Sequence, residues 1–214
     1  MKKHLLILSS SLLLTACNNN DSFATRWDGL KGRLFKSETE QQLDKVYMAI
    51  RDGNLEKAEL EISQISSPFT RATALGQLAH YEIFEKNDLI SAKKITEKLE
   101  ATIDGIPSKE DKLFAEIQLA DLKHFIDKAA SKELLKKIQP EVWSIVNPEE
   151  RSRLLIRLVA LELETQRDIE KAKKTIEETR QTIEFIQKSR IKDIRMKELD
   201  NLLYVNNHIL CQSL

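Results

Sequence analysis

The sequence contains little glycine, proline or cysteine, and neither sign of charge is in excess. Among 214 residues there are five Gly, four Pro and two Cys, and 34 basic side chains are balanced by 34 acidic ones. Few residues therefore interrupt a helix, and the sequence predicts a nearly all-helical chain with little sheet. The neutral balance gives no electrostatic basis for nucleic-acid binding, which usually needs a clearly basic face.

The apolar run near the N-terminus is too short to span a bilayer. Leu5 to Leu14 is made only of Leu, Ile and Ser, and it follows a short basic start that contains Lys2 and Lys3. A spanning helix needs about 20 apolar residues, whereas an export signal needs a basic start and an apolar run of about 7 to 15. Its length thus favours a cleaved export signal.

The residues after this run contain the most specific motif of the chain. Leu14, Thr15, Ala16 and Cys17 read "LTAC", which resembles the lipobox of bacterial lipoproteins. The resemblance implies that residues 1–16 are a signal peptide, that the Cys17 sulfur carries diacylglycerol, and that Cys17 is the first mature residue. Because each buried methylene contributes about 0.8 kcal/mol, two or three acyl chains anchor a protein durably. We expect attachment to a membrane without crossing it.

The segment after Cys17 is polar and is expected to be a tether. Residues 18–22 read "NNNDS" and have no apolar face, so residues 17–36 are interpreted as the lipidated cysteine and a flexible linker. In lipoprotein sorting of the enterobacterial kind, Asp directly after the cysteine retains the protein at the inner membrane. Asn18 stands there instead, which favours the outer membrane, facing the periplasm. Cys211 then has no disulfide partner and is interpreted as a small hydrophobic residue.

Helix starts are well marked along residues 37–214, which are interpreted as one α-helical repeat domain. Ser67 precedes Pro68, Ser108 has Asp111 three residues on, and Asn147 precedes Pro148, and each pattern is typical of a helix N-terminus. The predicted helices cover residues 38–52, 54–66, 68–86, 88–103, 109–127, 131–146, 148–166, 168–187 and 190–211.

Two stretches of the chain align without a gap at an offset of 80 residues. They begin at Arg71 and Arg151, and Asp88 matches Asp168 within them. A third stretch, residues 112–126, aligns between them, which gives a repeat of about 40 residues. A lone helical hairpin cannot bury its apolar face, so stacked neighbours are expected to bury it.

The turns "GNLEKA", "NDLISA" and "RDIEKA" resemble the turn and second-helix start of tetratricopeptide repeats. The family's large aromatic residue and its Leu-Gly pair are mostly missing, and the spacing drifts from 34 to about 40 residues. The resemblance implies antiparallel helical hairpins stacked as a short right-handed α-solenoid, tetratricopeptide-like. Such arrays bind partners along the helices that come first in each hairpin.

No catalytic motif is present in the sequence. There is no HExxH zinc motif, no Walker loop, no dinucleotide fingerprint and no Gly-x-Ser-x-Gly. His80, His124 and His208 are scattered, so we expect neither a metal site nor a cofactor apart from the covalent lipid on Cys17. Asp121, His124 and Asp127 share a helical face, an arrangement that is commoner as a solvated cluster.

A stripe of mixed polar and aromatic side chains follows the first helices of the repeats. Polar groups beside aromatic rings suit a peptide or a partner helix. The stripe comprises Thr73, Gln77, His80 and Phe84, then Phe114, Gln118, Asp121 and Phe125, then Arg153, Arg157, Ala160 and Glu164. The alternative is a merely solvated stripe whose aromatic residues Phe84 and Phe125 turn into the core.

Three functions remain open from the sequence. The first is a protein-interaction scaffold or assembly factor that binds another envelope protein or a peptide. The second is a structural or surface-displayed lipoprotein, such as an exclusion or immunity factor. The third is a cell-envelope hydrolase that uses two carboxylates, which a helical array without a deep cleft seldom holds at a fixed short distance. The non-enzymatic scaffold is the reading that we favour.

Overall fold

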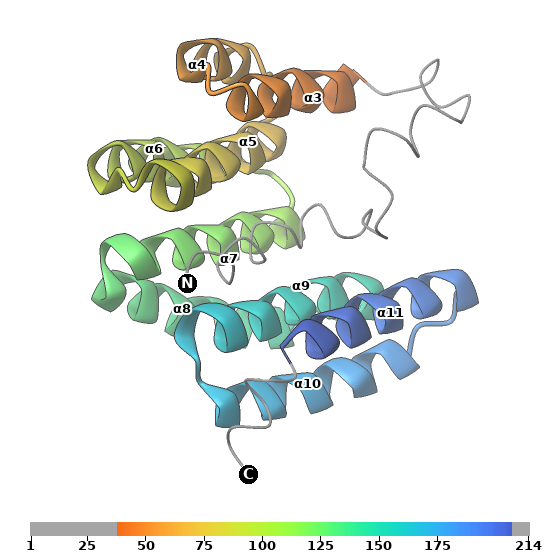
Figure 1. Cartoon of the computed structure of the whole chain (residues 1–214). Coiled ribbons are helices and arrows are strands. Elements are labelled where there is room, and N and C mark those ends of the chain that lie inside the picture. The colour runs from red at the N-terminus through yellow and green to blue at the C-terminus, as the bar shows by residue number, and fades with distance from the viewer. Residues whose placement is uncertain (1–37, 207–214) are drawn as a thin grey trace. The chain divides into compact units, whose positions relative to one another are not determined.

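The computed structural model describes residues 38–206, and these are helical throughout apart from short connections (Figure 1). Nine α-helices, two π-helical segments and no strand occur in this range, which confirms the predicted all-α class. Residues 38–106 and 107–206 belong to two compact units, here called unit 1 and unit 2 and described separately. The predictions for residues 1–37, Cys17 included, and for residues 207–214 fall outside the described residues.

Unit 1 contains two pairs of consecutive helices that pack against each other. α3 packs on α4, α5 packs on α6, and α5 also contacts α3 and α4. The elements are α3 (Glu38–Arg51), α4 (Leu55–Ser63), α5 (Pro68–Tyr81), η2 (Glu82–Lys86) and α6 (Leu89–Ile103). Since a short connection makes packed neighbours antiparallel, each pair is a helical hairpin.

Unit 2 contains two further hairpins and a last helix without a described partner helix after it. α7 packs on α8 and α9 on α10, while α9 also contacts α7, α8 and α11. The elements are α7 (Lys109–Ile126), α8 (Lys128–Trp143), α9 (Pro148–Ala160), η3 (Leu161–Gln166), α10 (Ile169–Glu184) and α11 (Ser189–Val205). In Figure 1, α9 and α11 lie next to each other above α10.

The second helix of every hairpin starts in the same way. Its N-cap is Asn54, Asp88, Asp127 or Asp168, and the side-chain oxygen accepts a hydrogen bond from a backbone N–H of the first turn. Four residues after each cap stands a small residue with no exposed surface: Ala58, Ala92, Ser131 and Ala172. A small side chain there lets the two helices of the hairpin approach closely.

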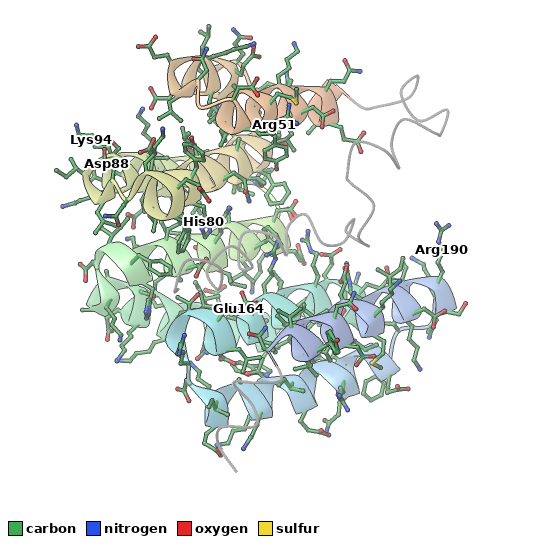
Figure 2. All side chains as sticks on the ribbon, in the orientation of Figure 1. Arg51, His80, Asp88, Lys94, Glu164 and Arg190 are labelled. Carbon is green, nitrogen blue, oxygen red and sulfur yellow. The ribbon has the colours of Figure 1, made fainter. Side chains whose placement is uncertain are left out.

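The N-cap of α6 also illustrates how charge is placed in these turns. The backbone N–H and the hydroxyl of Ser91 both donate to Asp88, which lowers the pKa of that carboxyl. Lys94 lies nearby in the second turn of the same helix and acts in the same direction (Figure 2). The carboxylate is thus held ionised at the positive end of the helix dipole.

The first helices of two hairpins end in π-helical segments at equivalent positions, 80 residues apart. The π-helical segments η2 and η3 are followed by Asn87 at φ 55° and Arg167 at φ 53°, both left-handed. In each case the next residue donates its N–H to a glutamate carbonyl, Glu82 or Glu162, at 2.9 Å. The sequence repeat therefore extends to the detailed backbone path.

The joints between hairpins carry a second shared pattern. Ile65, Ile106, Ile145 and Ile186 follow the last turns of α4, α6, α8 and α10, and each is at most 5% exposed. The predicted caps of the next helices are confirmed, because Ser67, Ser108 and Asn147 each accept a backbone N–H. No helix within residues 38–206 is long and apolar enough to cross a membrane.

Candidate functional site

The unit 1 part of the predicted stripe is mostly buried. Thr73 is 9% and His80 5% exposed, whereas Gln77 and Phe84 are half-buried. The Thr73 hydroxyl donates to the carbonyl of Phe69 at 3.0 Å, and the His80 ring stacks on Phe84 with centroids 5.5 Å apart. These side chains are therefore committed largely to internal contacts.

In unit 2, two arginines of α9 lie over one aromatic ring of α7. The guanidinium carbons of Arg153 and Arg157 are 5.2 and 4.9 Å from the centroid of the Phe114 ring. Phe114 is only 9% exposed, so the ring is largely covered. A guanidinium over an aromatic face gains roughly 0.5 to 2 kcal/mol, depending on how far it is removed from water. The stripe residues of α7 and α9 thus form one cluster.

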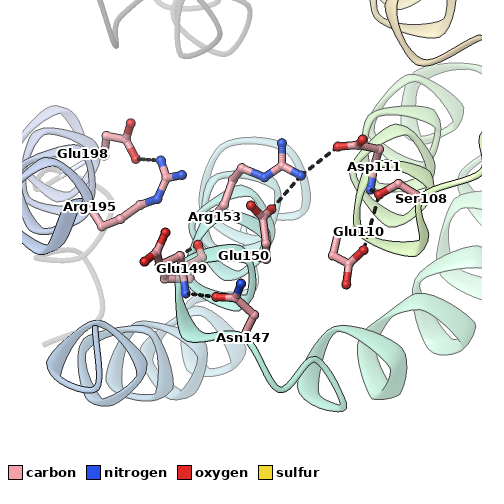
Figure 3. A network of polar contacts seen from close by, with 10 residues as sticks. Ser108, Glu110, Asp111, Asn147, Glu149, Glu150, Arg153, Arg195 and Glu198 are labelled. Carbon is pink, nitrogen blue, oxygen red and sulfur yellow. Dashed lines mark hydrogen bonds and ion pairs between the residues drawn. The ribbon is translucent and has the colours of Figure 1, made fainter. Parts of the chain in front are cut away.

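Arg153 is held by two carboxylates, one from each of the helices that meet there (Figure 3). One guanidinium nitrogen lies 3.0 Å from Asp111 of α7 and 2.9 Å from Glu150 of its own helix. On α11, Arg195 pairs with Glu198 at 2.8 Å. These partly buried pairs fix the side chains more firmly than exposed pairs would.

Arg157 differs because no carboxylate in the described residues lies within ion-pairing distance of it. Burial lowers the pKa of Arg157 to about 10, while Asp121, Glu198 and Glu164 act in the opposite direction from farther away. The guanidinium is still charged near neutral pH, and it retains hydrogen-bond donors that its contact with Phe114 does not use.

Two acidic residues of the stripe are engaged by neighbouring side chains. The Thr165 hydroxyl donates to Asp121 at 2.6 Å, and the Asn206 amide donates to Glu164 at 3.0 Å. Burial raises the pKa of Glu164, and the negative charge of Asp121 adds to the effect. Since α7, η3 and the end of α11 meet here, the cluster connects three elements of unit 2.

Gln118 is the least satisfied member of the cluster. It is 8% exposed, and neither its amide nitrogen nor its amide oxygen has a hydrogen-bond partner within the described chain. An unpaired buried amide costs about 1 to 3 kcal/mol. Such a group gains stability if a partner molecule supplies a donor and an acceptor. Ala160 and Phe125, the remaining stripe residues of unit 2, are half-buried.

Sequence reasoning missed several residues that complete the cluster, namely Asp111, Glu150, Thr165, Glu198 and Asn206. The sequence identifies Asp111 and Glu150 only as acidic residues in the first turns of their helices. Nothing in the spacing of Thr165 or Asn206 indicates that each donates to a carboxylate more than 40 residues away. Both bonds depend on how η3 packs against α7 and against the end of α11, which the sequence does not indicate.

The chemistry available in this cluster is that of polar recognition. It offers a guanidinium with free donors, an unpaired amide and an aromatic ring, held by helices that pack on one another. Among residues 38–206 no group of three or more His, Cys, Asp and Glu side chains could hold a metal ion. His124 is half-buried beside Phe125, and burial lowers its pKa, with Lys128 acting in the same direction.

Comparison with known protein families, curated proteins and solved structures identified no similar protein.

Proposed function

We propose that this chain is a lipid-anchored interaction scaffold of the bacterial envelope, in which Cys17 carries the lipid and unit 2 binds another envelope protein or a peptide. The outer membrane, on its periplasmic side, is the proposed location, because Asn18 follows the cysteine. The protein acts by binding rather than by catalysis. The proposal includes stacking of the hairpins as a short right-handed α-solenoid of the tetratricopeptide-like kind.

The observation that carries the binding role is the contact between Arg157 and Phe114. The guanidinium lies 4.9 Å above the ring and makes no ion pair within the described residues. Arginine and aromatic residues are both enriched at the anchoring positions of protein interfaces. Gln118 on the same helix as Phe114 has a buried amide without a partner, which supports recognition of a peptide backbone.

The shared construction of the hairpins supports the scaffold role. Each second helix has an Asx cap and a fully buried small residue four positions later. Stacked hairpins of this kind gain stability from nearest-neighbour packing and present their first helices as an extended surface. The choice of binding partner depends on the side chains of that surface and not on the fold alone.

Mass spectrometry tests the anchor. Protein recovered from the membrane fraction should begin at Cys17 and carry the mass of a diacylglyceryl group, with or without a further acyl chain. The Cys17→Ser variant should lose that mass and leave the membrane fraction. An unmodified Cys17 in membrane-bound protein would contradict the anchor and leave the binding surface unaffected.

Photo-crosslinking in intact cells tests the surface. A crosslinking amino acid placed at Arg153 should give a discrete protein adduct, and one placed at the exposed Arg180 of α10 should not. Replacing Arg157 by Glu should weaken that adduct, provided that circular dichroism shows the same helix content. Identical adducts from positions 153 and 180 would remove the proposed surface.

A further inference from the structure

One ridge of α8 carries exposed lysines at every helical turn. Lys128, Lys132 and Lys136 are spaced four residues apart and all are exposed. Trp143 lies on the same side of the helix by its spacing from Lys132 and Lys136, and it is 37% exposed. The side of α8 that packs into unit 2 is a different one, formed by Ser131, Leu135, Ile138 and Val142.

Like charges four residues apart destabilise a helix by about 0.2 to 0.5 kcal/mol per pair, and this ridge contains two such pairs in succession. The neighbouring second helix of unit 2 does not share the pattern. On α10, Lys173 and Lys174 are each followed four residues later by an acid, Glu177 or Glu178. The unbroken ridge is therefore a local property of α8 and is not general to these helices.

One acidic side chain, Glu133, neutralises Lys136 of the ridge, whereas no ion pair within residues 38–206 involves Lys128 or Lys132. Residues 123–137 contain five lysines against two acids, a local excess in a chain of zero net charge. Glu133 is bound to Lys136 at 2.6 Å, and Glu141 lies 3.5 Å from Lys109 of α7. Lys128 and Lys132 keep their charge for an outside partner.

The C-terminal end of the ridge is apolar as well as exposed. Trp143 is the last residue of α8, and Val146, three residues on, is 92% exposed. Tryptophan is enriched at the depth of the lipid headgroups, where its ring is partly in apolar and partly in wet surroundings. Lysines beside such a residue are attracted to anionic headgroups.

We infer that the ridge formed by Lys128, Lys132 and Lys136, together with Trp143, is a membrane-docking surface for a bilayer that contains anionic phospholipids. Lys128 and Lys132 bind headgroup phosphates, Lys136 offsets the negative charge of Glu133 beside them, and Trp143 with Val146 enters the interface. The contact goes beyond the proposed anchor at Cys17, because it fixes which side of unit 2 meets the membrane. The cluster around Arg157 is built from α7, α9, η3 and α11, so α8 can hold the lipid without using those residues.

Trp143 fluorescence tests this inference in the full chain. With Trp27→Phe, Trp143 is the only tryptophan, since the chain contains two. The protein is mixed with phosphatidylcholine vesicles that carry brominated acyl chains, with or without about 30% phosphatidylglycerol. Bromine should quench Trp143 only in the anionic vesicles, and added salt should reverse the quenching because it screens the attraction.

The charge dependence is tested with Lys128→Gln, Lys132→Gln and Lys136→Gln combined. At roughly fivefold per lysine, loss of three should weaken the lipid-dependent quenching on the order of a hundredfold. The matched control removes three other exposed lysines, Lys93, Lys94 and Lys174, and should quench like the parent. Adding inorganic phosphate at constant ionic strength should not displace the protein, since the proposed ligand is the bilayer surface.

The outcomes separate this inference from the anchor. Attachment to both kinds of vesicle with Trp143 unquenched in both would contradict the ridge and leave the anchor intact. Attachment only to anionic vesicles, lost in the triple variant, supports the ridge even without an anchor. Equal quenching in the triple variant and in its control, with helix content unchanged, overturns the inference.

Discussion

Glu82 and Glu162 stand 80 residues apart in the chain and occupy equivalent buried positions, each in the π-helical segment that ends the first helix of a hairpin. They are 4% and 0% exposed, and burial raises the pKa of both carboxyls. Glu162 is better supplied with partners, since Gln139 donates to it at 3.1 Å and Lys171 lies 3.7 Å away. Burial nevertheless makes the ionised form of each carboxyl less stable than it is in water, at Glu82 and at Glu162 alike.

Glu162→Gln is expected to reduce the dependence of stability on pH. Because the pKa of Glu162 is raised from 4.5 in the folded chain, the folded state binds the proton more tightly, and stability falls as pH rises through the folded pKa. The glutamine side chain does not titrate, so the urea midpoint of the variant should decline less than that of the parent between about pH 4.5 and pH 7. Urea unfolding followed by circular dichroism at several pH values measures the difference.

Glu133→Gln is the control for this prediction. A hydrogen bond from Lys136 lowers the pKa of Glu133, so its contribution has the opposite sign: it is present above the unfolded pKa and lost as pH falls. Replacing Glu133 should therefore leave unchanged the decline of the urea midpoint at pH values above about 4.5. Parallel pH profiles of Glu162→Gln and the parent would contradict the assignment.

Leu78→Ala and Leu158→Ala should cost similar amounts of stability. The two leucines are equivalent in the repeat and are 1% and 0% exposed, so each truncation should lower the free energy of unfolding by about 2 to 5 kcal/mol. Hydrogen exchange should show faster exchange in unit 1 for the first variant and in unit 2 for the second. Val146→Ala, at a position 92% exposed, should stay within about 0.5 kcal/mol of the parent.

Arg167→Asn should stabilise unit 2. Arg167 has φ 53°, and asparagine stands at the equivalent position, Asn87, with φ 55°. Left-handed backbone costs most residues roughly 1 to 2 kcal/mol and costs asparagine less, so we expect a gain of about 0.5 to 1 kcal/mol. The thermal midpoint measures it. Arg180→Asn, in the middle of α10, should instead lower the midpoint, because asparagine is a poorer helix former.

Asn206→Ala should raise the pKa of Glu164 further. The Asn206 amide donates to Glu164 at 3.0 Å and to the carbonyl of Leu202 at 2.9 Å, and the first bond favours the ionised carboxylate. Its loss should also cost about 1 to 3 kcal/mol, since the amide is 3% exposed. Carboxyl chemical shifts followed against pH report the change. In Asn201→Ala, at an exposed position of α11, the pKa should not move.

Much of the fold could be predicted from helix-end chemistry. The N-caps Ser67, Ser108 and Asn147 begin helices within one residue of their predicted starts, because caps and first-turn prolines act locally. α8 is the exception. It begins at Lys128, three residues before the predicted start, since Asp127 caps it and the Ser131 hydroxyl instead donates to the carbonyl of Ala120 at 2.6 Å.

The candidate site could be predicted only as a set of positions on single helices. Helical spacing alone places Arg157 and Phe114 in one stripe. The position of the Arg157 guanidinium over the Phe114 ring depends on how α7 and α9 pack. The same limit applies to the π-helical segments, because the extra residue in each is a property of the backbone and has no sequence marker at η2 or η3. Asp88 and Asp168 indicate in the sequence where the next helix begins. No residue type indicates the π-helical turn that precedes each of them.

A single residue, Asp127, separates α7 from α8, whereas two residues separate η2 from α6 and η3 from α10. Asp127 ends α7, with its N–H donated to Lys123, and its side chain caps α8 through the N–H groups of Ala129 and Ala130. One residue serves both helices, so any insertion at this place separates the two roles. Asp88 and Asp168 have the same two roles at their joints, so loop grafts, epitope tags and circular permutation sites should leave all three aspartates joined directly to the helices that they cap.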